Sequence, residues 1–186
     1  MQAKITVLFL LYNASQYVHG LVEAIALQRH PDHDRQQDWL EVLFMDNGST
    51  DETGRVLAEA VAAAGSPGHY RIATNPVNIG YARAVNKAFE LTRTLYLLTC
   101  HCDCLFGSDD YVAGMLDLLE RHPDAGSITG QPAIPAHKPI PFAEKVNLVA
   151  YLMDILPTKA QVDLVRVGFS EGRCDGFRVK AVEAAG

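Results

Sequence analysis

The stretch Val42-Leu43-Phe44-Met45-Asp46-Asn47-Gly48-Ser49-Thr50-Asp51 decides the fold, because an apolar run passes through an acid into a polar turn. Consecutive apolar residues of this kind suit a strand that is buried on both faces of a sheet. Ser49 and Glu52 have S-x-x-E spacing, which lets each side chain accept a backbone N–H at a helix start. The stretch therefore predicts a strand, a tight turn and a helix in immediate succession.

Asp46 is the first candidate site residue, because it ends the predicted strand. Open α/β sheets bind ligands at the carboxyl ends of their parallel strands, where an acid can hydrogen-bond a ribose. An aspartate in a turn also commonly bonds its own backbone without any ligand. Both interpretations fit Asp46, and the local pattern does not separate them.

Apolar runs and amphipathic segments alternate along the rest of the chain. Ile5–Leu11 is an apolar run, and helical spacing follows at Val18, Val22 and Ile25. This alternation predicts an α/β, Rossmann-like fold with a mostly parallel sheet and helices on both faces. The expected strands are 5–11, 39–45, 70–74, 95–98 and 126–131, and the expected helices are 16–28, 50–64, 81–92, 108–121, 146–156 and 177–185, with a proline-rich extended crossing at 132–141.

Length and composition limit the class of protein. A chain of 186 residues that is 48% hydrophobic can bury a full core, and its length suits one domain over residues 1–186. The net charge of −6 is spread along the chain, so no nucleic-acid-binding surface is expected. Because the helix expected at 177–185 begins just before the chain stops, we expect the domain to be incomplete at its C-terminus.

Cysteine spacing and hydropathy indicate in which compartment of the cell the protein is expected. Three of the four cysteines crowd into residues 100–104, unlike the spaced disulfide framework of a small secreted protein, which favours a cytoplasmic chain. No run approaches the ~20 apolar residues that span a bilayer. The amphipathic helix at 146–156 could lie on the inner face of the membrane, although packing on the sheet is the default for such a stripe.

The second candidate site is Cys100-His101-Cys102-Asp103-Cys104, which follows the fourth expected strand. If the strand continues, the cysteines face one side while His101 and Asp103 face the other. His101 and Asp103 could hold Mn²⁺, or Mg²⁺ bound mainly through Asp103 and a diphosphate, and the alternative is a polar strand end facing water. Structural zinc sites seldom use C-x-C-x-C spacing, so small buried cysteines are expected instead.

Three familiar motifs are missing or incomplete. The first turn, Tyr12-Asn13-Ala14-Ser15, lacks G-x-G-x-x-G, and no G-x-x-x-x-G-K-[ST] occurs, which argues against dinucleotide and P-loop chemistry. Gly168-Phe169-Ser170-Glu171-Gly172 fits the G-x-S-x-G elbow of hydrolases, but that triad needs a later histidine and none follows His137. This segment is predicted to be a loop.

Several short motifs follow one another in a recognisable order: Tyr12-Asn13, Asp46 to Asp51, Asn78-Ile79-Gly80-Tyr81-Ala82-Arg83-Ala84-Val85-Asn86 and His101-Cys102-Asp103. Their order and spacing resemble a family 2 glycosyltransferase of the GT-A fold. The likeness continues through His122-Pro123-Asp124-Ala125-Gly126 and covers nearly the whole chain. It implies a GT-A fold and an enzyme that uses a sugar nucleotide.

The resemblance also assigns roles to residues. It implies that Tyr12 and Asp46 hold the nucleotide base, and that Asn78 and Gly80 line the same pocket. The D-x-D motif of such families meets the ribose and the diphosphate-bound metal, and its positions are His101, Cys102 and Asp103 here. Asp103 would be a metal ligand and His101 a second one, for Mn²⁺ or Mg²⁺. Because the first acid is missing, weaker or altered metal dependence is expected.

The implied reaction transfers a sugar, usually with inversion, from a nucleoside-diphosphate sugar to a glycan or lipid-linked acceptor, as in polysaccharide biosynthesis. The family's general base lies in an acidic segment after a helix like Phe177–Ala185, where this chain stops, so the catalytic base is unknown. Glu171 and Asp175 do not match that position. One alternative is a non-catalytic nucleotide-sugar-binding module. Another, ranked lower, is a metal or redox protein that uses Cys100, Cys102 and Cys104.

Overall fold

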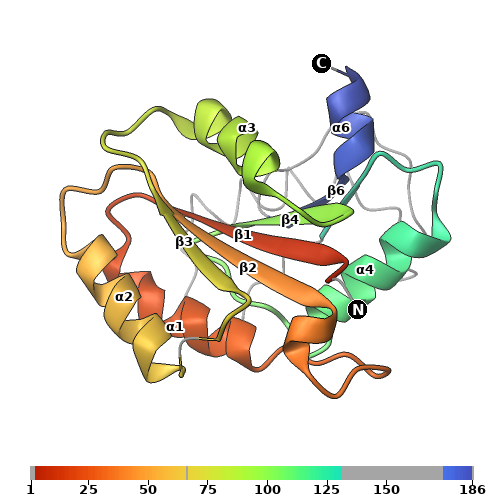
Figure 1. The fold of residues 1–186 in the computed structure, drawn as a ribbon, viewed down its shortest axis with the longest axis horizontal. Helices are drawn as coiled ribbons and strands as arrows, with labels where there is room; N and C mark the ends of the chain where they lie inside the picture. The colour runs from red at the N-terminus through yellow and green to blue at the C-terminus, as the bar shows by residue number, and fades with distance from the viewer. Residues whose placement is uncertain (1–2, 66, 131–173, 186) are drawn as a thin grey trace, which may run out of the picture. The chain divides into compact units, whose positions relative to one another are not determined.

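The computed structural model describes residues 3–65, 67–130 and 174–185, all of which belong to one compact unit of the chain (Figure 1). Strands and helices alternate through most of it, as the periodicity predicts. The elements are β1 (Ile5–Leu11), α1 (Ser15–Ala26), the 3₁₀ turn η1 (Gln36–Asp38), β2 (Leu40–Asp46), α2 (Thr53–Ala63), β3 (Tyr70–Thr74), α3 (Tyr81–Leu91), β4 (Tyr96–His101), α4 (Tyr111–Arg121), β5 (Ser127–Thr129), β6 (Cys174–Arg178) and α6 (Val179–Ala185).

The sheet is mostly parallel, which confirms the expected fold class. Its strand order is β3-β2-β1-β4-β6-β5. β1 pairs in parallel with both β2 and β4, and β2 pairs in parallel with β3. β6 runs antiparallel to β4 and to β5. The carboxyl ends of β1, β2 and β4 therefore lie side by side at one edge of the sheet.

Helices cover both faces of the sheet, as expected (Figure 1). One apolar cluster joins alternate residues of the strands to α1, α2 and α4, with Phe9, Leu21 and Leu57 among its buried members. A smaller cluster on the other face holds Ala84 of α3 and Val179 of α6. The near-continuous apolar runs of β1 and β2 follow from burial on both faces.

Two expectations near the ends of strands are wrong. The fourth strand was expected at 95–98, but β4 runs to His101, and its Thr99 and Cys100 are buried. A helix was expected from Phe177, but Phe177 lies in β6 and the helix begins at Val179. Both differences have one cause, because β4 and β6 pair with each other across more than 70 intervening residues and stabilise backbone that local propensity leaves ambiguous.

Several predictions concern residues outside the described ranges. They are the proline-rich crossing at 132–141, the amphipathic helix at 146–156 and the loop at 168–172, which contains Glu171. The single domain over residues 1–186 and its incomplete C-terminus also stay predictions. Among the described residues, no helix is both long enough and apolar enough to cross a bilayer.

Candidate functional site

The sheet register brings the sequence-predicted residues to one edge. Leu11, the last residue of β1, is paired with Asp46, and Leu10 is paired with His101. Tyr12 directly follows β1, and its side chain is 46% exposed. The ends of β1, β2 and β4 thus present an aromatic ring, a carboxylate and an imidazole from three chain segments that are far apart in sequence.

Asp46 supports the turn that follows it. Its Oδ1 accepts a hydrogen bond of 2.9 Å from the Ser49 backbone N–H, and the residue is only 6% exposed. A Cβ built on Gly54 would lie 3.3 Å from Asp46 Oδ2, so the carboxylate is directed towards the first turn of α2. Asp46 therefore makes the turn contact that the sequence allowed, at the strand end where a ligand acid was also expected.

The capping box predicted from Ser49 and Glu52 is wrong. α2 begins at Thr53 rather than Thr50, and Glu52 makes no side-chain cap hydrogen bond. Ser49 Oγ instead accepts from the Asn13 backbone N–H at 3.0 Å. The helix start is served by Asp51, whose Oδ1 accepts from the Thr53 backbone N–H at 3.0 Å. The loop after β1 takes the Ser49 hydroxyl in place of the start of α2, because the parallel pairing of β1 and β2 brings Asn13 beside Ser49.

These contacts bind the loop after β1 to the loop after β2. Asn13, which has a positive φ of 49°, accepts from the Thr50 backbone N–H through Oδ1 at 2.9 Å. The Ala14 backbone N–H donates to Thr53 Oγ1 at 2.8 Å. Hydrogen bonds to the loop after β2 and to the start of α2 therefore hold the backbone that follows Tyr12, while the ring of Tyr12 stays open to solvent.

Asp51 gives this junction a pH dependence. Hydrogen bonds from Thr53, with that from its hydroxyl the largest cause, lower the pKa of Asp51 from 3.8 to about 2. A carboxyl whose folded pKa is depressed stabilises the fold above its unfolded pKa, and this contribution is lost as the pH falls towards about 2. The junction is therefore strongest at neutral pH and weakens in acid.

We expect Asp51→Asn to lower the melting temperature at about pH 6 and to have progressively less effect as the pH falls from 3.8 towards about 2, because protonation of the unfolded chain and then of the folded protein removes the advantage of the charge. Melting curves of the two proteins over this range measure the difference. Thr53→Val removes the donating hydroxyl and should likewise make the melting temperature depend less on pH in the acid range. Parallel curves for wild type and Asp51→Asn would contradict the role given to this carboxylate.

A buried amide network holds the loop of Asn78 and Gly80 against the end of β2. Asn47, only 3% exposed, donates through Nδ2 to Asn78 Oδ1 at 3.0 Å. Its Oδ1 accepts from Asn75 Nδ2 at 2.9 Å and from the Ile79 backbone N–H at 3.3 Å. Asn78 Oδ1 also accepts from the Gly80 backbone N–H at 2.8 Å. Each buried polar group thus has a partner, which fixes the loop.

Sequence reasoning missed Asn47 and Asn75 as positioning residues. Both occur where turns were expected, and asparagine in a turn is common without any further role. The signal that could have found them is the run of asparagines at 75 and 78 after the third strand. Lys87 of α3 donates to Asn75 Oδ1 and extends the network to the helix.

His101 ends β4 beside an aromatic ring. The rings of His101 and Tyr81 have centroids 5.7 Å apart. Partial burial, together with the negative charge of Asp175, raises the pKa of Tyr81. Asp103 is exposed, and its Oδ1 accepts a long contact of 3.7 Å from Cys104 Sγ. Both candidate metal ligands therefore lie at an accessible part of the sheet edge.

The cysteine cluster is arranged differently from the sequence expectation. Cys100 is buried in the core, and the partly buried Cys102 packs against the same cluster, as alternation predicts. The thiol partner of Cys100 is Cys174 of β6, with the two Sγ atoms 3.2 Å apart. Among the described residues, no group of three or more His, Cys, Asp or Glu side chains could hold a metal ion.

Asp175 is a buried acid that the sequence pattern did not place. It lies in β6 opposite Thr99 and is 1% exposed. The sequence pattern assigned no element to residues 173–176, so the strand that buries this carboxylate was not expected. Its position inside the sheet does not suit a group that must meet an acceptor molecule.

Comparison with known proteins identifies the family. The model of glycosyl transferase family 2 matches residues 6–186. The chain belongs to this family. The fold agrees, because a mannosyltransferase of Pyrobaculum calidifontis, solved in complex with GDP-Man and Mn²⁺, superposes with a TM-score of 0.71 at 18% identity. That match covers 100% of this chain and 47% of the mannosyltransferase.

Two further proteins are similar to this chain, one in fold and one in sequence. Glucosyl-3-phosphoglycerate synthase of Mycobacterium tuberculosis, solved with Mn²⁺, UDP and glucosyl-3-phosphoglycerate, has a TM-score of 0.57 at 16% identity and is matched over 96% of this chain and 57% of its own. Teichoic acid poly(glycerol phosphate) polymerase of Staphylococcus epidermidis is 29% identical over 100 residues, which are 54% of this chain and 13% of that protein. The chain thus spans only part of the length of these proteins, and its likeness to the two solved structures is one of fold.

Proposed function

We propose that this chain is the donor-binding part of a glycosyltransferase, which takes a nucleoside-diphosphate sugar and transfers its sugar to a glycan or lipid-linked acceptor. The observation that carries the proposal is the register that joins Leu11 to Asp46 and Leu10 to His101. It sets candidate groups from three strands at the edge where parallel α/β sheets bind ligands. Structural neighbours solved with GDP-Man or UDP support the ligand class.

The nucleoside would lie against Tyr12, Asp46, Asn78 and Gly80. The exposed ring of Tyr12 offers a stacking surface. Asp46 would accept from the base or ribose while one of its oxygens holds the turn. The Asn47 amide fixes the loop of Asn78 and Gly80 through its hydrogen bond to Asn78 Oδ1, so this wall of the pocket would be preorganised rather than ordered by the ligand.

The diphosphate and a divalent cation would lie at His101 and Asp103. One imidazole nitrogen and one carboxylate fit Mn²⁺, whereas Mg²⁺ would rely on Asp103. Because the described residues hold no cluster of three ligands, the coordination would need oxygens of the bound diphosphate, as sites with few protein ligands do. A bound cation would supply positive charge to the departing diphosphate. His101 and Asp103 would orient that end of the donor.

The cheapest test is the melting temperature with UDP, GDP or dTDP, each with and without Mn²⁺. One nucleotide at about 100 times its dissociation constant should raise it by about 5–10 °C, since only the folded chain binds it. Asp103→Asn should remove the Mn²⁺-dependent part of the rise. Asp109→Asn is the matched control, because Asp109 is another exposed acid of the same loop. If no nucleotide shifts the transition, the donor site is wrong.

A non-catalytic nucleotide-sugar-binding module is the second candidate. It is favoured by His101, which stands where the first acid of D-x-D is usual, and by the burial of Asp175. The catalytic base is not assigned to any described residue. A nucleotide-induced rise in melting temperature, without release of nucleotide from a sugar donor in the presence of acceptors, would support the module. Release of nucleotide together with transfer of the sugar to an acceptor would support the transferase.

A further inference from the structure

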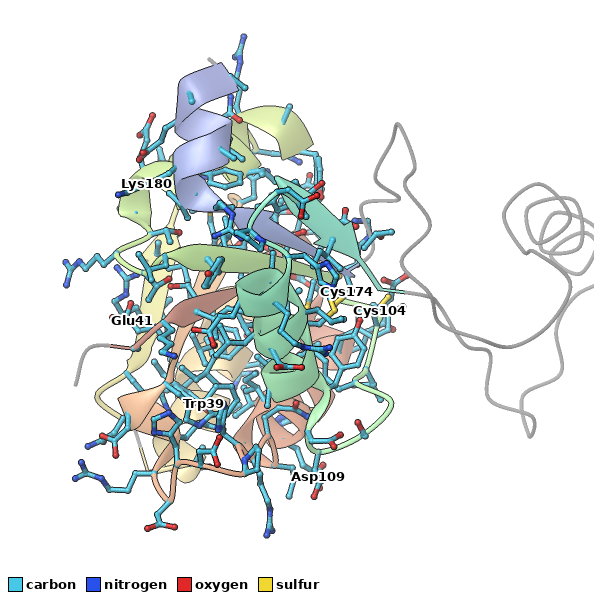
Figure 2. All side chains as sticks on the ribbon, turned by 90° about the vertical axis from the view of Figure 1, so that its right-hand side faces the viewer. Trp39, Glu41, Cys104, Asp109, Cys174 and Lys180 are labelled. Atoms are coloured by element: carbon cyan, nitrogen blue, oxygen red, sulfur yellow. The ribbon has the colours of Figure 1, made fainter. Side chains whose placement is uncertain are left out.

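Cys100 and Cys174 face each other across two adjacent strands. They are directly paired in the antiparallel register of β4 and β6, and their Sγ atoms are 3.2 Å apart. In Figure 2, yellow sulfur atoms lie beside the label of Cys174. Cys100 is 4% exposed, whereas Cys174 is only partly buried. The buried Cys100 is thus in contact with a less buried cysteine.

The backbone of this pair suits a covalent bond. Residues opposite each other in antiparallel strands have Cα atoms about 4.5–5.5 Å apart. Disulfides form over Cα separations of about 4.4–6.8 Å. The two sulfur atoms need to approach each other by only about 1 Å, which side-chain rotation can supply. The pair can therefore be oxidised without rearranging the sheet.

The two thiols differ in reactivity. Hydrogen bonds with Cys100, the largest cause, and with Tyr111 hold the pKa of Cys174 below its ordinary value. Cys100 is buried in the core. Because the thiolate is the reactive form, the more accessible Cys174 is the thiol that meets a reagent from solvent. Cys100 is then placed to attack the mixed disulfide that forms at Cys174.

We propose that Cys100 and Cys174 form a reversible disulfide by exchange with a low-molecular-weight disulfide such as oxidised glutathione. The Cys174 thiolate attacks one sulfur of the reagent and releases one thiolate, giving a mixed disulfide at Cys174. Cys100 attacks the Cys174 sulfur and releases the second thiol, which takes up the Cys100 proton. Two protein thiols are oxidised, and the reagent is reduced to two thiols.

The bond would join the strand that ends in His101 to the strand that carries Asp175. It would close the chain from residue 100 to residue 174, and cross-links that close long segments raise stability mainly by restricting the unfolded chain. The oxidised protein should therefore melt at a higher temperature than the reduced protein. This inference stands on the sulfur geometry and is independent of the proposed donor site.

Trypsin mapping of the full chain tests the pairing directly. The whole of β6 forms one tryptic peptide, 174–178, and the other three cysteines lie in another, 94–121. After treatment with oxidised glutathione and blocking of remaining thiols, the two peptides should appear joined, with the mass lowered by two hydrogens. A bond between two of Cys100, Cys102 and Cys104 would stay within peptide 94–121.

Variants identify the partner within peptide 94–121. The double variant Cys102→Ser and Cys104→Ser should still give the joined peptides, and its melting temperature should rise on oxidation and fall on reduction. Cys100→Ala should abolish both the joined peptides and the redox-dependent change in melting temperature. If Cys100→Ala fails to fold because the site is buried, Cys174→Ser provides the same test. Retention of all four thiols, or a pairing that leaves out Cys174, would overturn the proposal.

Discussion

Gly48→Ala is expected to lower the free energy of unfolding by about 2–5 kcal/mol. Gly48 has a φ of 74°, which costs a residue with a Cβ about 1–2 kcal/mol. A Cβ would also lie 2.2 Å from the Val77 carbonyl carbon and 2.5 Å from the Asn78 nitrogen, and forced overpacking costs about 1–3 kcal/mol more. Urea unfolding at neutral pH, followed by circular dichroism, measures the loss.

Substitutions at two other glycines separate the conformational cost from the cost of overpacking. Gly65 has a similar φ of 85° but no atom within 4 Å of an added Cβ, so Gly65→Ala should cost only the conformational part, about 1–2 kcal/mol. Gly107 also has open space, without a positive φ, and Gly107→Ala should be near neutral. If Gly48→Ala and Gly65→Ala cost the same, close packing of the turn on residues 77 and 78 does not matter for stability.

The same substitution should affect ligand binding. Relief of the clash has to move Val77 and Asn78, because the atoms met by the new Cβ are backbone. Asn78 belongs to the loop that is proposed to line the nucleoside pocket. We therefore expect a smaller nucleotide-induced rise in melting temperature for Gly48→Ala than for Gly65→Ala, even where both are fully folded. An equal rise would mean that this loop does not contact the nucleotide.

Arg178→Met should cost about 2–4 kcal/mol, because the guanidinium joins β6 to the end of α4. Its Nη2 donates to the backbone oxygens of Leu119 at 2.7 Å and His122 at 3.2 Å, its Nε to that of Ala125 at 3.3 Å, and its Nη1 to the Tyr96 hydroxyl at 3.2 Å. Methionine keeps the apolar stem but leaves helix-end carbonyls without this cation. Chemical denaturation with an unchanged m-value reports the loss.

Arg55→Met is the matched control. Arg55 pairs with Glu52 and Glu59 on the surface of α2, where its side chain is 58% exposed. Surface ion pairs contribute little, so the change should stay within about 0.5 kcal/mol. Arg178→Lys should lie between wild type and methionine, because one ammonium cannot reproduce a planar fork of donors. If both substitutions lower the free energy of unfolding equally, the contacts of Arg178 contribute no more to stability than a surface ion pair does.

Local sequence patterns predicted most of the described elements. The bounds of β1 and β3 agree with the expected ranges, and α3 begins at the expected Tyr81. These segments carry strong periodicity and clear turn residues, so short-range information is sufficient for them. β6 could not be found in this way. Cys174–Arg178 contains a glycine and two charged residues, and it is extended because β4 and β5 flank it on both sides.

The candidate site was predicted in outline rather than in detail. Tyr12, Asp46 and His101 were expected at one edge because parallel strands share their carboxyl ends, and the register agrees. The partner of Ser49 and the partner of Cys100 were not foreseeable. Asn13 and Cys174 are 36 and 74 residues away from them in sequence, and no local rule ranks such distant contacts.

The sequence by itself determined the class of fold and the family, and it indicated the strand ends at which we propose that a sugar nucleotide binds, because burial on two faces and the turn chemistry leave local signatures. Only the tertiary structure decided which side chains meet. The Ser49 hydroxyl serves a neighbouring loop instead of its own helix, Asn47 fixes the loop of Asn78, and Cys100 meets Cys174. Each of these contacts depends on strand order and register, which are set by packing of the whole sheet.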